Sequence, residues 1–140
     1  MDMKKDNVFG DIFYDYGWRK KEKIKFWNKQ IEIEINVVAY DGEGITEIQR
    51  EEYRWLKNNL ELISEACLTR INEYISENYG SYDIKFKDIS KLVSPIEILF
   101  ERDEKVIGII FNCDFDRENG IGIKIKDRKI TTIGYQNTVL

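Results

Sequence analysis

The chain has 140 residues, the length of a single domain, and its 42% apolar content, 34% charged content and net charge of -4 are typical of a soluble globular protein. It contains no histidine, which excludes Ser-His-Asp and Cys-His catalysis and most zinc sites. No apolar run has the length of a signal-peptide core or a membrane span, so we expect a cytoplasmic protein, with no membrane partner, whose cysteines Cys67 and Cys113 are reduced.

Charge is unevenly distributed along the sequence. Residues 1–30 carry a net charge of +3, residues 31–88 carry -7, and residues 89–140 are balanced. A nucleic-acid binder needs a basic excess to neutralise phosphates, whereas the excess here is confined to residues 19–25, a pattern typical of a solvated strand face or edge. The acidic middle therefore favours a basic protein partner over nucleic acid.

The first forty residues favour three strands. Val8 to Tyr14 is a short apolar and aromatic run that glycine and aspartate interrupt, and Lys23 to Trp27 alternates between polar and apolar residues. After a two-residue turn at Asn28 and Lys29, residues 30–40 alternate again, which is the period of a half-buried strand. We expect an antiparallel meander.

A turn and a long helical segment follow. Residues 41–44, Asp-Gly-Glu-Gly, precede the helix, but their two acids would repel phosphate, so they predict a turn and not an anion site. Thr46 and Gln49 have the spacing of a capping box. Residues 47–78 contain no Gly or Pro and predict one long helix, or two helices separated near residues 58–59. Its apolar stripe consists of Leu56, Leu60, Ile63, Cys67, Ile71 and Tyr74.

The remaining residues predict a second antiparallel meander. A short strand is possible at Ile84 to Phe86, and a tight turn is expected at Asp127 and Arg128. The four later strands are predicted at Ile96 to Phe100, Val106 to Phe111, Ile121 to Lys126 and Lys129 to Gly134. The fold class is therefore α+β: residues 1–140 form a single domain with an antiparallel sheet of about seven strands (three strands, a long helix, then about four strands) and the helix packed on one face.

The loop over residues 112–120 carries carboxylates at alternate positions, Asp114, Asp116 and Glu118. It differs from the calcium-binding loop because its glycine comes one residue late and its twelfth position is Ile125 instead of Glu. Three interpretations remain open: a polar hairpin loop, a partner contact, or a divalent-metal site.

Three aromatic residues, Tyr14, Tyr16 and Trp18, surround Gly17 next to the basic residues 19–25. At alternate positions they favour packing on one strand face, while a protein contact and a stacking platform for nucleic-acid bases are the alternatives.

Four motifs resemble a family of small bacterial domains of unknown function. They are FGDIFYDYGW, GITEIQREEY, CDFDRENGIGIKI and GYQNTVL, and the family commonly has YGW near its start, an aspartate-containing loop before GIG, and a G-x-Q-D tail. Asn137 stands where that tail has aspartate. The resemblance implies a role like that of cognate immunity proteins in bacterial toxin systems.

The leading hypothesis is a non-enzymatic cytoplasmic binding protein without a cofactor, an immunity protein that neutralises a basic toxin domain through an acidic surface. Its predicted partner-binding residues are Asp41, Glu43, Glu47, Glu51, Asp114, Asp116, Glu118 and Trp18. One alternative is a small metal-dependent hydrolase that uses the Asp114, Asp116 and Glu118 loop. The other is a homo-oligomeric adaptor.

Overall fold

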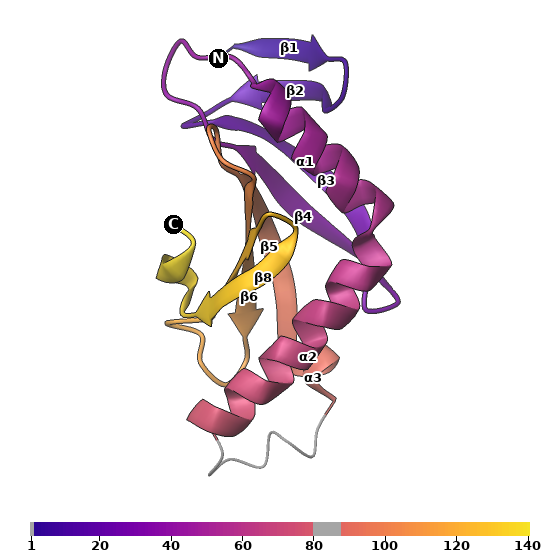
Figure 1. Cartoon of the computed structure of the whole chain (residues 1–140), viewed down its shortest axis with the longest axis vertical. Helices are drawn as coiled ribbons and strands as arrows, with labels where there is room; N and C mark the ends of the chain where they lie inside the picture. The colour runs from indigo at the N-terminus through magenta and orange to yellow at the C-terminus, as the bar shows by residue number, and fades with distance from the viewer. Residues whose placement is uncertain (1, 80–87) are drawn as a thin grey trace.

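The first half of the sheet is an antiparallel meander of four strands, one more than the sequence predicts. The computed structural model describes residues 2–79 and 88–140. In chain order the strands are β1 (Met3–Asp6), β2 (Gly10–Tyr14), β3 (Trp18–Phe26) and β4 (Lys29–Val37) (Figure 1). β1 has no apolar alternation, which is why its sequence does not reveal it. The β3–β4 turn falls at Trp27 and Asn28, one residue earlier than predicted, and both have the positive φ (52° and 61°) that suits a two-residue hairpin.

Two consecutive helices cross one face of the sheet, as Figure 1 shows. α1 (Glu47–Asn58) begins with the predicted capping box: Thr46 Oγ1 accepts from the Gln49 amide at 3.2 Å, and Gln49 Oε1 accepts from the Thr46 amide at 2.9 Å. α2 (Leu60–Asn78) starts after Asn59, so the predicted alternative of two helices is confirmed. The buried apolar residues of the pair are Tyr53, Leu56, Ile63, Cys67, Ile71 and Ile75, while Leu60 and Tyr74 are half-buried.

The second half of the sheet is the predicted second meander. A short helix, α3 (Ile89–Leu92), leads into β5 (Val93–Phe100), β6 (Val106–Cys113), β7 (Ile121–Lys126) and β8 (Lys129–Gly134). β5 begins earlier than predicted because a register shift between Pro95 and Glu97 accommodates the proline. The predicted short strand at Ile84 to Phe86 lies outside the described residues.

The two meanders join through a parallel pair, so the sheet is not antiparallel throughout. In the described parts of the chain the eight strands lie in sequence order, and β4 pairs with β5 in parallel, with Ile35 opposite Ile98 and Val37 opposite Phe100. Parallel neighbours need a crossover connection, which α1 and α2 supply. The expected sheet is therefore corrected to a mixed one with mostly antiparallel pairs.

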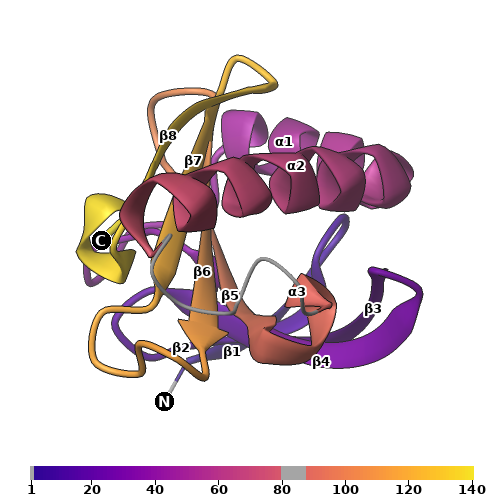
Figure 2. The same cartoon turned by 90° about the horizontal axis from the view of Figure 1, so that it is seen from below.

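The C-terminal segment packs on the sheet face opposite α1 and α2. It contains the short helix η2 (Gln136–Thr138), and Val139 forms a small separate cluster with Leu99 and Ile110 (Figure 2). Glycines leave room for it, because a Cβ at Gly122 would lie 2.8 Å from the Tyr135 carbonyl oxygen. The GIG and G-x-Q motifs thus contact each other across this face. Asn137 is exposed.

Both cysteines lie in the core as free thiols. Cys67 and Cys113 are 0% and 1% exposed, and burial raises the pKa of each to about 12, which makes the reactive thiolate scarce at neutral pH. Among the helices of the described residues, none combines the length and the apolar character needed to cross a membrane.

Candidate binding site

The loop that joins β4 to α1, residues 38–46, is held in place by hydrogen bonds that are buried or partly buried. Gln49, which is fully buried, donates from Nε2 to the carbonyl oxygens of Val38 (2.8 Å) and Phe100 (2.9 Å), and so connects the ends of β4 and β5. The Tyr14 hydroxyl donates to the Ala39 carbonyl oxygen at 3.1 Å.

Two further side chains hold the acidic tip of this loop. The Trp18 indole donates to the Glu43 carbonyl oxygen at 2.9 Å, and Arg102 Nη1 donates to the Gly44 carbonyl oxygen at 2.8 Å. The carboxylate of Glu43 accepts from the Tyr40 amide at 2.7 Å and lies 3.5 Å from Arg102 Nε. These bonds fix the tip before any ligand arrives.

A pocket of about 370 Å³ opens between this loop and the β2–β3 turn. Its lining consists of Tyr14, Tyr16, Asn36, Val38, Ala39, Tyr40 and Asp41. Tyr16 and Tyr40 are 89% and 78% exposed, an unusual state for large aromatic side chains. We call this the tyrosine pocket.

The charged groups that act on the Tyr14 hydroxyl at the tyrosine pocket are both acids. Asp41 is the one charged residue in the described lining, and within the described chain its carboxylate has no hydrogen bond or ion pair. Desolvation raises the pKa of the Tyr14 hydroxyl, and the negative charges of Asp41 and Glu43 raise it further. Because the faces of tyrosine rings also attract cations, the pocket is suited to a positively charged group.

The β2–β3 turn reaches the pocket because Gly17 allows it. Gly17 has φ of 126°, and a Cβ there would lie 2.6 Å from Asn36 Oδ1. Asn36 is itself 7% exposed, and its Oδ1 has no hydrogen-bond partner in the described residues. The glycine of the YGW motif therefore serves the backbone geometry of this turn.

The predicted partner-binding residues fall into two separate groups. Asp41, Glu43, Glu47 and Glu51 lie in the β4–α1 loop and at the start of α1, whereas Asp114, Asp116 and Glu118 lie in the β6–β7 loop. Arg102, close to the start of β6, bonds the first group, and the second group follows the end of β6, a strand roughly 24 Å long at 3.4 Å per residue (Figure 1). The structure does not unite them in one surface.

Trp18 is a correction to the predicted contact set. It is 8% exposed and packs edge-on against Tyr14 with ring centroids 5.4 Å apart. Its indole N–H donates to the carbonyl oxygen of Glu43. Trp18 therefore stabilises the β4–α1 loop from its buried side. Of the aromatic residues around Gly17, Tyr16 is the exposed one.

The acidic residues of α1 differ in how far neighbouring arginines neutralise their charge. Glu47 lies 3.5 Å from Arg50 and 3.4 Å from Arg54, so arginines of its own helix partly neutralise it. Glu51 is exposed. Asp41 is thus the acid best placed to meet an incoming cation at the pocket.

The β6–β7 loop is stabilised by hydrogen bonds to Asp116 from within the loop and from the end of α2. Asp116 accepts from the Tyr79 hydroxyl at 2.6 Å and from Asn119 Nδ2 at 3.2 Å, and the Tyr79 bond is the main cause of its lowered pKa. Asp114 and Glu118 are exposed. In the described residues, no group of three or more His, Cys, Asp or Glu side chains has the arrangement to hold a metal ion.

Sequence reasoning missed Tyr40 and Asn36. Tyr40 follows the alternating residues of β4 and reads as a strand end, and Asn36 occupies an ordinary polar position in that strand. The pairing of Trp18 with Val37 brings both next to the β2–β3 turn, a contact between segments about twenty residues apart. The sequence feature that could have indicated the pocket is the run Ala39-Tyr40-Asp41 shortly after β4.

Fold and pocket together define an α+β domain with a pocket lined by three tyrosines and by the carboxylate of Asp41. The chain belongs to the family described as Domain of unknown function (DUF6985), whose model matches residues 8–140. The comparisons with curated proteins and with solved structures found no match.

Proposed function

We propose that this protein is a non-enzymatic binding domain that takes a lysine or arginine side chain of a basic protein partner into the tyrosine pocket. One observation carries the proposal: Tyr14, Tyr16 and Tyr40 surround a pocket whose described lining has a single charge, the unpaired carboxylate of Asp41. A cation over tyrosine rings gains about 0.5–2 kcal/mol, depending on its desolvation, and a carboxylate adds a charge-assisted hydrogen bond.

The rigidity of the loop supports the same function. Tyr40 and Asp41 lie on a segment whose neighbours are bonded by Gln49, Trp18 and Arg102. A preorganised site spends little of its interaction energy on ordering itself when it binds. The net charge of -7 over residues 31–88 would in addition accelerate encounter with a basic partner.

We further propose that the partner is a basic toxin domain and that the two proteins meet in the cytoplasm, with this protein acting as its immunity protein. The support is the resemblance of the four motifs to domains found near toxin systems, together with the negative pocket. Neither cofactor nor catalytic group is required for this role, because occlusion of a toxin surface depends on binding alone.

The test is co-expression with the toxin-like product of an adjacent gene, followed by calorimetry of the purified pair. We expect the wild-type chain to rescue growth and to bind with an affinity that falls as salt rises. The double variant Tyr40→Ala with Asp41→Asn should bind at least tenfold more weakly. Glu65→Gln, an exposed acid on α2 outside the pocket and outside the predicted contact residues, is the matched control and should stay within twofold.

Two results would overturn the proposal. One is the absence of a complex with the wild-type chain. The other is unchanged affinity in the double variant while its thermal unfolding matches that of wild type, because the pocket would then take no part in the interface.

A further inference from the structure

A second concave region lies between α2 and the β7–β8 hairpin. Its volume is about 650 Å³, within the roughly 300–1,000 Å³ of small-molecule sites. The apolar part of its lining consists of Trp55, Leu62, Ile63, Ala66, Ile125 and Ile130. We call it the hairpin groove.

One row of α2 forms the long wall of the groove. Asn59, Leu62, Ala66 and Thr69 follow one another at steps of three or four residues, so they share a helix face beside the buried stripe. From Asn59 to Arg70 this wall extends roughly 16 Å at 1.5 Å per residue. Leu62 is 66% exposed on it. The groove is therefore elongated, with an accessible aliphatic wall.

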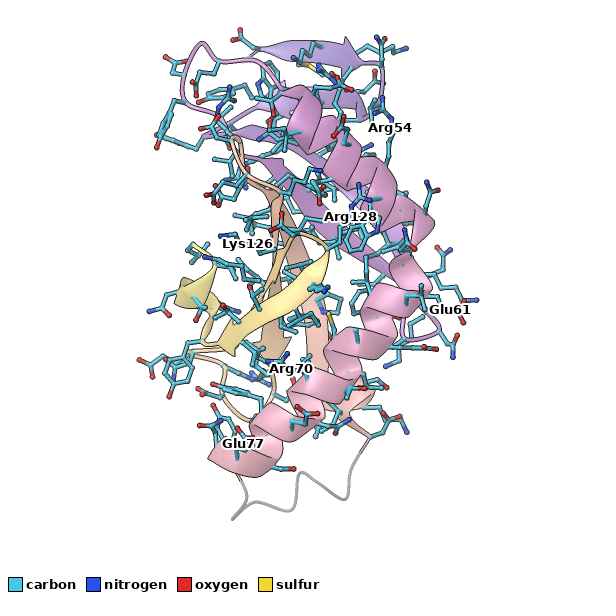
Figure 3. The ribbon with its side chains drawn as sticks, viewed as in Figure 1. Arg54, Glu61, Arg70, Glu77, Lys126 and Arg128 are labelled. Carbon is cyan, nitrogen blue, oxygen red and sulfur yellow. The ribbon has the colours of Figure 1, made fainter. Side chains whose placement is uncertain are left out.

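All charged side chains in the described lining are cations: Arg70, Arg128 and Lys129. Arg128 lies at the hairpin tip, next to Lys129 in the chain, while Arg70 lies lower down on α2 (Figure 3). The described lining thus contains no carboxylate, although the chain as a whole has a net charge of -4. Its charge complements an anion.

Arg128 has the geometry to hold that anion. Its φ of 67° belongs to the tight β7–β8 turn, and its guanidinium lies 5.6 Å from the Trp55 ring centroid, over the groove. Its Nε is 3.8 Å from Glu52 Oε1, too far for a hydrogen bond, and in the part of the chain that the structure describes the guanidinium makes no hydrogen bond. Its planar donors are thus available for bidentate contact with a carboxylate.

We propose that the hairpin groove binds the anion of a free fatty acid, with the acyl chain along α2 and the carboxylate at Arg128 and Lys129. An extended apolar wall with the adjacent cations Arg128 and Lys129 at the hairpin tip, and Arg70 alone at the other end, matches a ligand that has a long apolar body and one anionic head. This inference does not depend on the function proposed for the tyrosine pocket, since the two sites share no lining residue.

The test is calorimetric titration of the full chain with dodecanoate below its micelle concentration, with tryptophan fluorescence as a second signal. We expect saturable binding with one ligand per chain. Arg128→Gln should weaken it at least tenfold, and Ala66→Phe should weaken it as much by filling the groove without altering the cations. Arg54→Gln, an exposed arginine of α1 outside the groove (Figure 3), is the matched control and should stay within twofold.

Three further measurements distinguish this ligand from other occupants. Dodecanol should bind at least tenfold more weakly than dodecanoate because it lacks the charge. Trp55→Phe should remove most of the fluorescence change while calorimetry still detects the ligand. Light scattering should give one mass with and without dodecanoate.

Absence of dodecanoate binding would overturn the proposal, as would equal affinity for dodecanol or wild-type affinity in a folded Arg128→Gln variant. Binding to anionic phospholipid vesicles without binding to free dodecanoate would assign the cations to a membrane surface instead. Self-association through the groove would assign it to a second copy of the chain.

Discussion

The tyrosine pocket and the hairpin groove are opposite in charge and in construction. The described lining of the pocket contains one acid and no cation, and that of the groove contains three cations and no acid. The pocket sits on a loop secured by buried hydrogen bonds, whereas the groove takes its charges from a hairpin tip and a helix surface. The net charge of -4 therefore does not predict the charge of either site, because the few residues that line each site determine its local charge.

This difference predicts that substitutions around the pocket mainly change the stability of the fold, whereas substitutions in the groove mainly change ligand binding. Residues that hold the pocket are buried and bonded, so replacing them should weaken the fold. The cations of the groove are partly exposed, so replacing them should alter ligand affinity at little structural cost. Four predictions test this division.

The largest expected effect is the loss of stability in Gln49→Ala. The substitution removes three hydrogen bonds at once, those to the carbonyl oxygens of Val38 and Phe100 and the one from the Thr46 amide, and we expect the free energy of unfolding to fall by about 3 kcal/mol. Urea denaturation measures it. Gln30→Ala, at an exposed position of β4, should change it by less than about 0.5 kcal/mol. A loss below about 1 kcal/mol in Gln49→Ala would contradict the structural role of this amide.

The second prediction concerns Asp6, which joins β1 to α1. Burial would raise the pKa of Asp6, but Arg50 at 2.7 Å and the amides of Phe9 and Val8 outweigh it and lower the pKa from 3.8 to about 2. Since the folded-state pKa is depressed, the stabilisation is present above pH 3.8 and is lost as pH falls toward about 2.

Asp6→Asn should accordingly lower the free energy of unfolding at pH 7 by about 2 kcal/mol. Denaturation curves between pH 7 and pH 2 should show the two proteins converging at the acidic end. A difference that stays constant over this range would mean that the charge of Asp6 is not the stabilising feature.

Reciprocal binding measurements test the separation of the two sites directly. Tyr40→Ala should weaken binding of the basic partner about tenfold, near 1.4 kcal/mol, and leave dodecanoate affinity within twofold. Arg128→Gln should give the reverse result. Titration of both variants with both ligands checks this, and loss of both activities in either variant would show that the sites are coupled.

The smallest expected effect is a gain in stability from Glu52→Gln beside the groove. Glu52 is 1% exposed, its carboxylate oxygens have no hydrogen-bond partner among the described residues, and desolvation raises its pKa above 4.5. Because the folded state favours the protonated acid, stability present below pH 4.5 is lost as pH rises through the raised pKa.

The variant should therefore be more stable than wild type by about 1 kcal/mol at pH 8 and equal to it at pH 4. Thermal unfolding at the two pH values measures this difference. Lower stability at pH 8 would mean that the Arg128 ion pair outweighs desolvation. Dodecanoate affinity should rise slightly, because Arg128 loses a competing carboxylate.

Local features of the fold were predictable from the sequence, whereas strand order was not. The Thr46 capping box and the break before α2 depend on neighbouring residues, and so does the turn at Asp127 and Arg128. The parallel pairing of β4 with β5 has no local signal, because an alternating strand looks the same beside either neighbour. β1 was missed since three of its four residues are polar and it has no apolar alternation.

The candidate sites were predictable only in part for the same reason. Asp41 stood out as an acid in a turn, but two of its three tyrosine neighbours, Tyr14 and Tyr16, come from a distant segment of the chain. The hairpin groove combines Trp55, Leu62 and Arg128, which belong to α1, α2 and a turn and share no motif. The sequence feature that could have indicated the groove is the row of Leu62, Ala66 and Thr69 on α2, beside the apolar stripe.

The parallel junction between β4 and β5 has a consequence for how the chain folds. Each meander pairs segments that are close in sequence, so each can form at a low entropic cost of loop closure, whereas joining β4 to β5 closes the interval over residues 38–92. We therefore expect the halves to gain structure first and to dock late. Gln49, from the crossover helix, donates to Val38, directly after β4, and to Phe100, the last residue of β5, so its buried amide stabilises the junction once the two halves have docked.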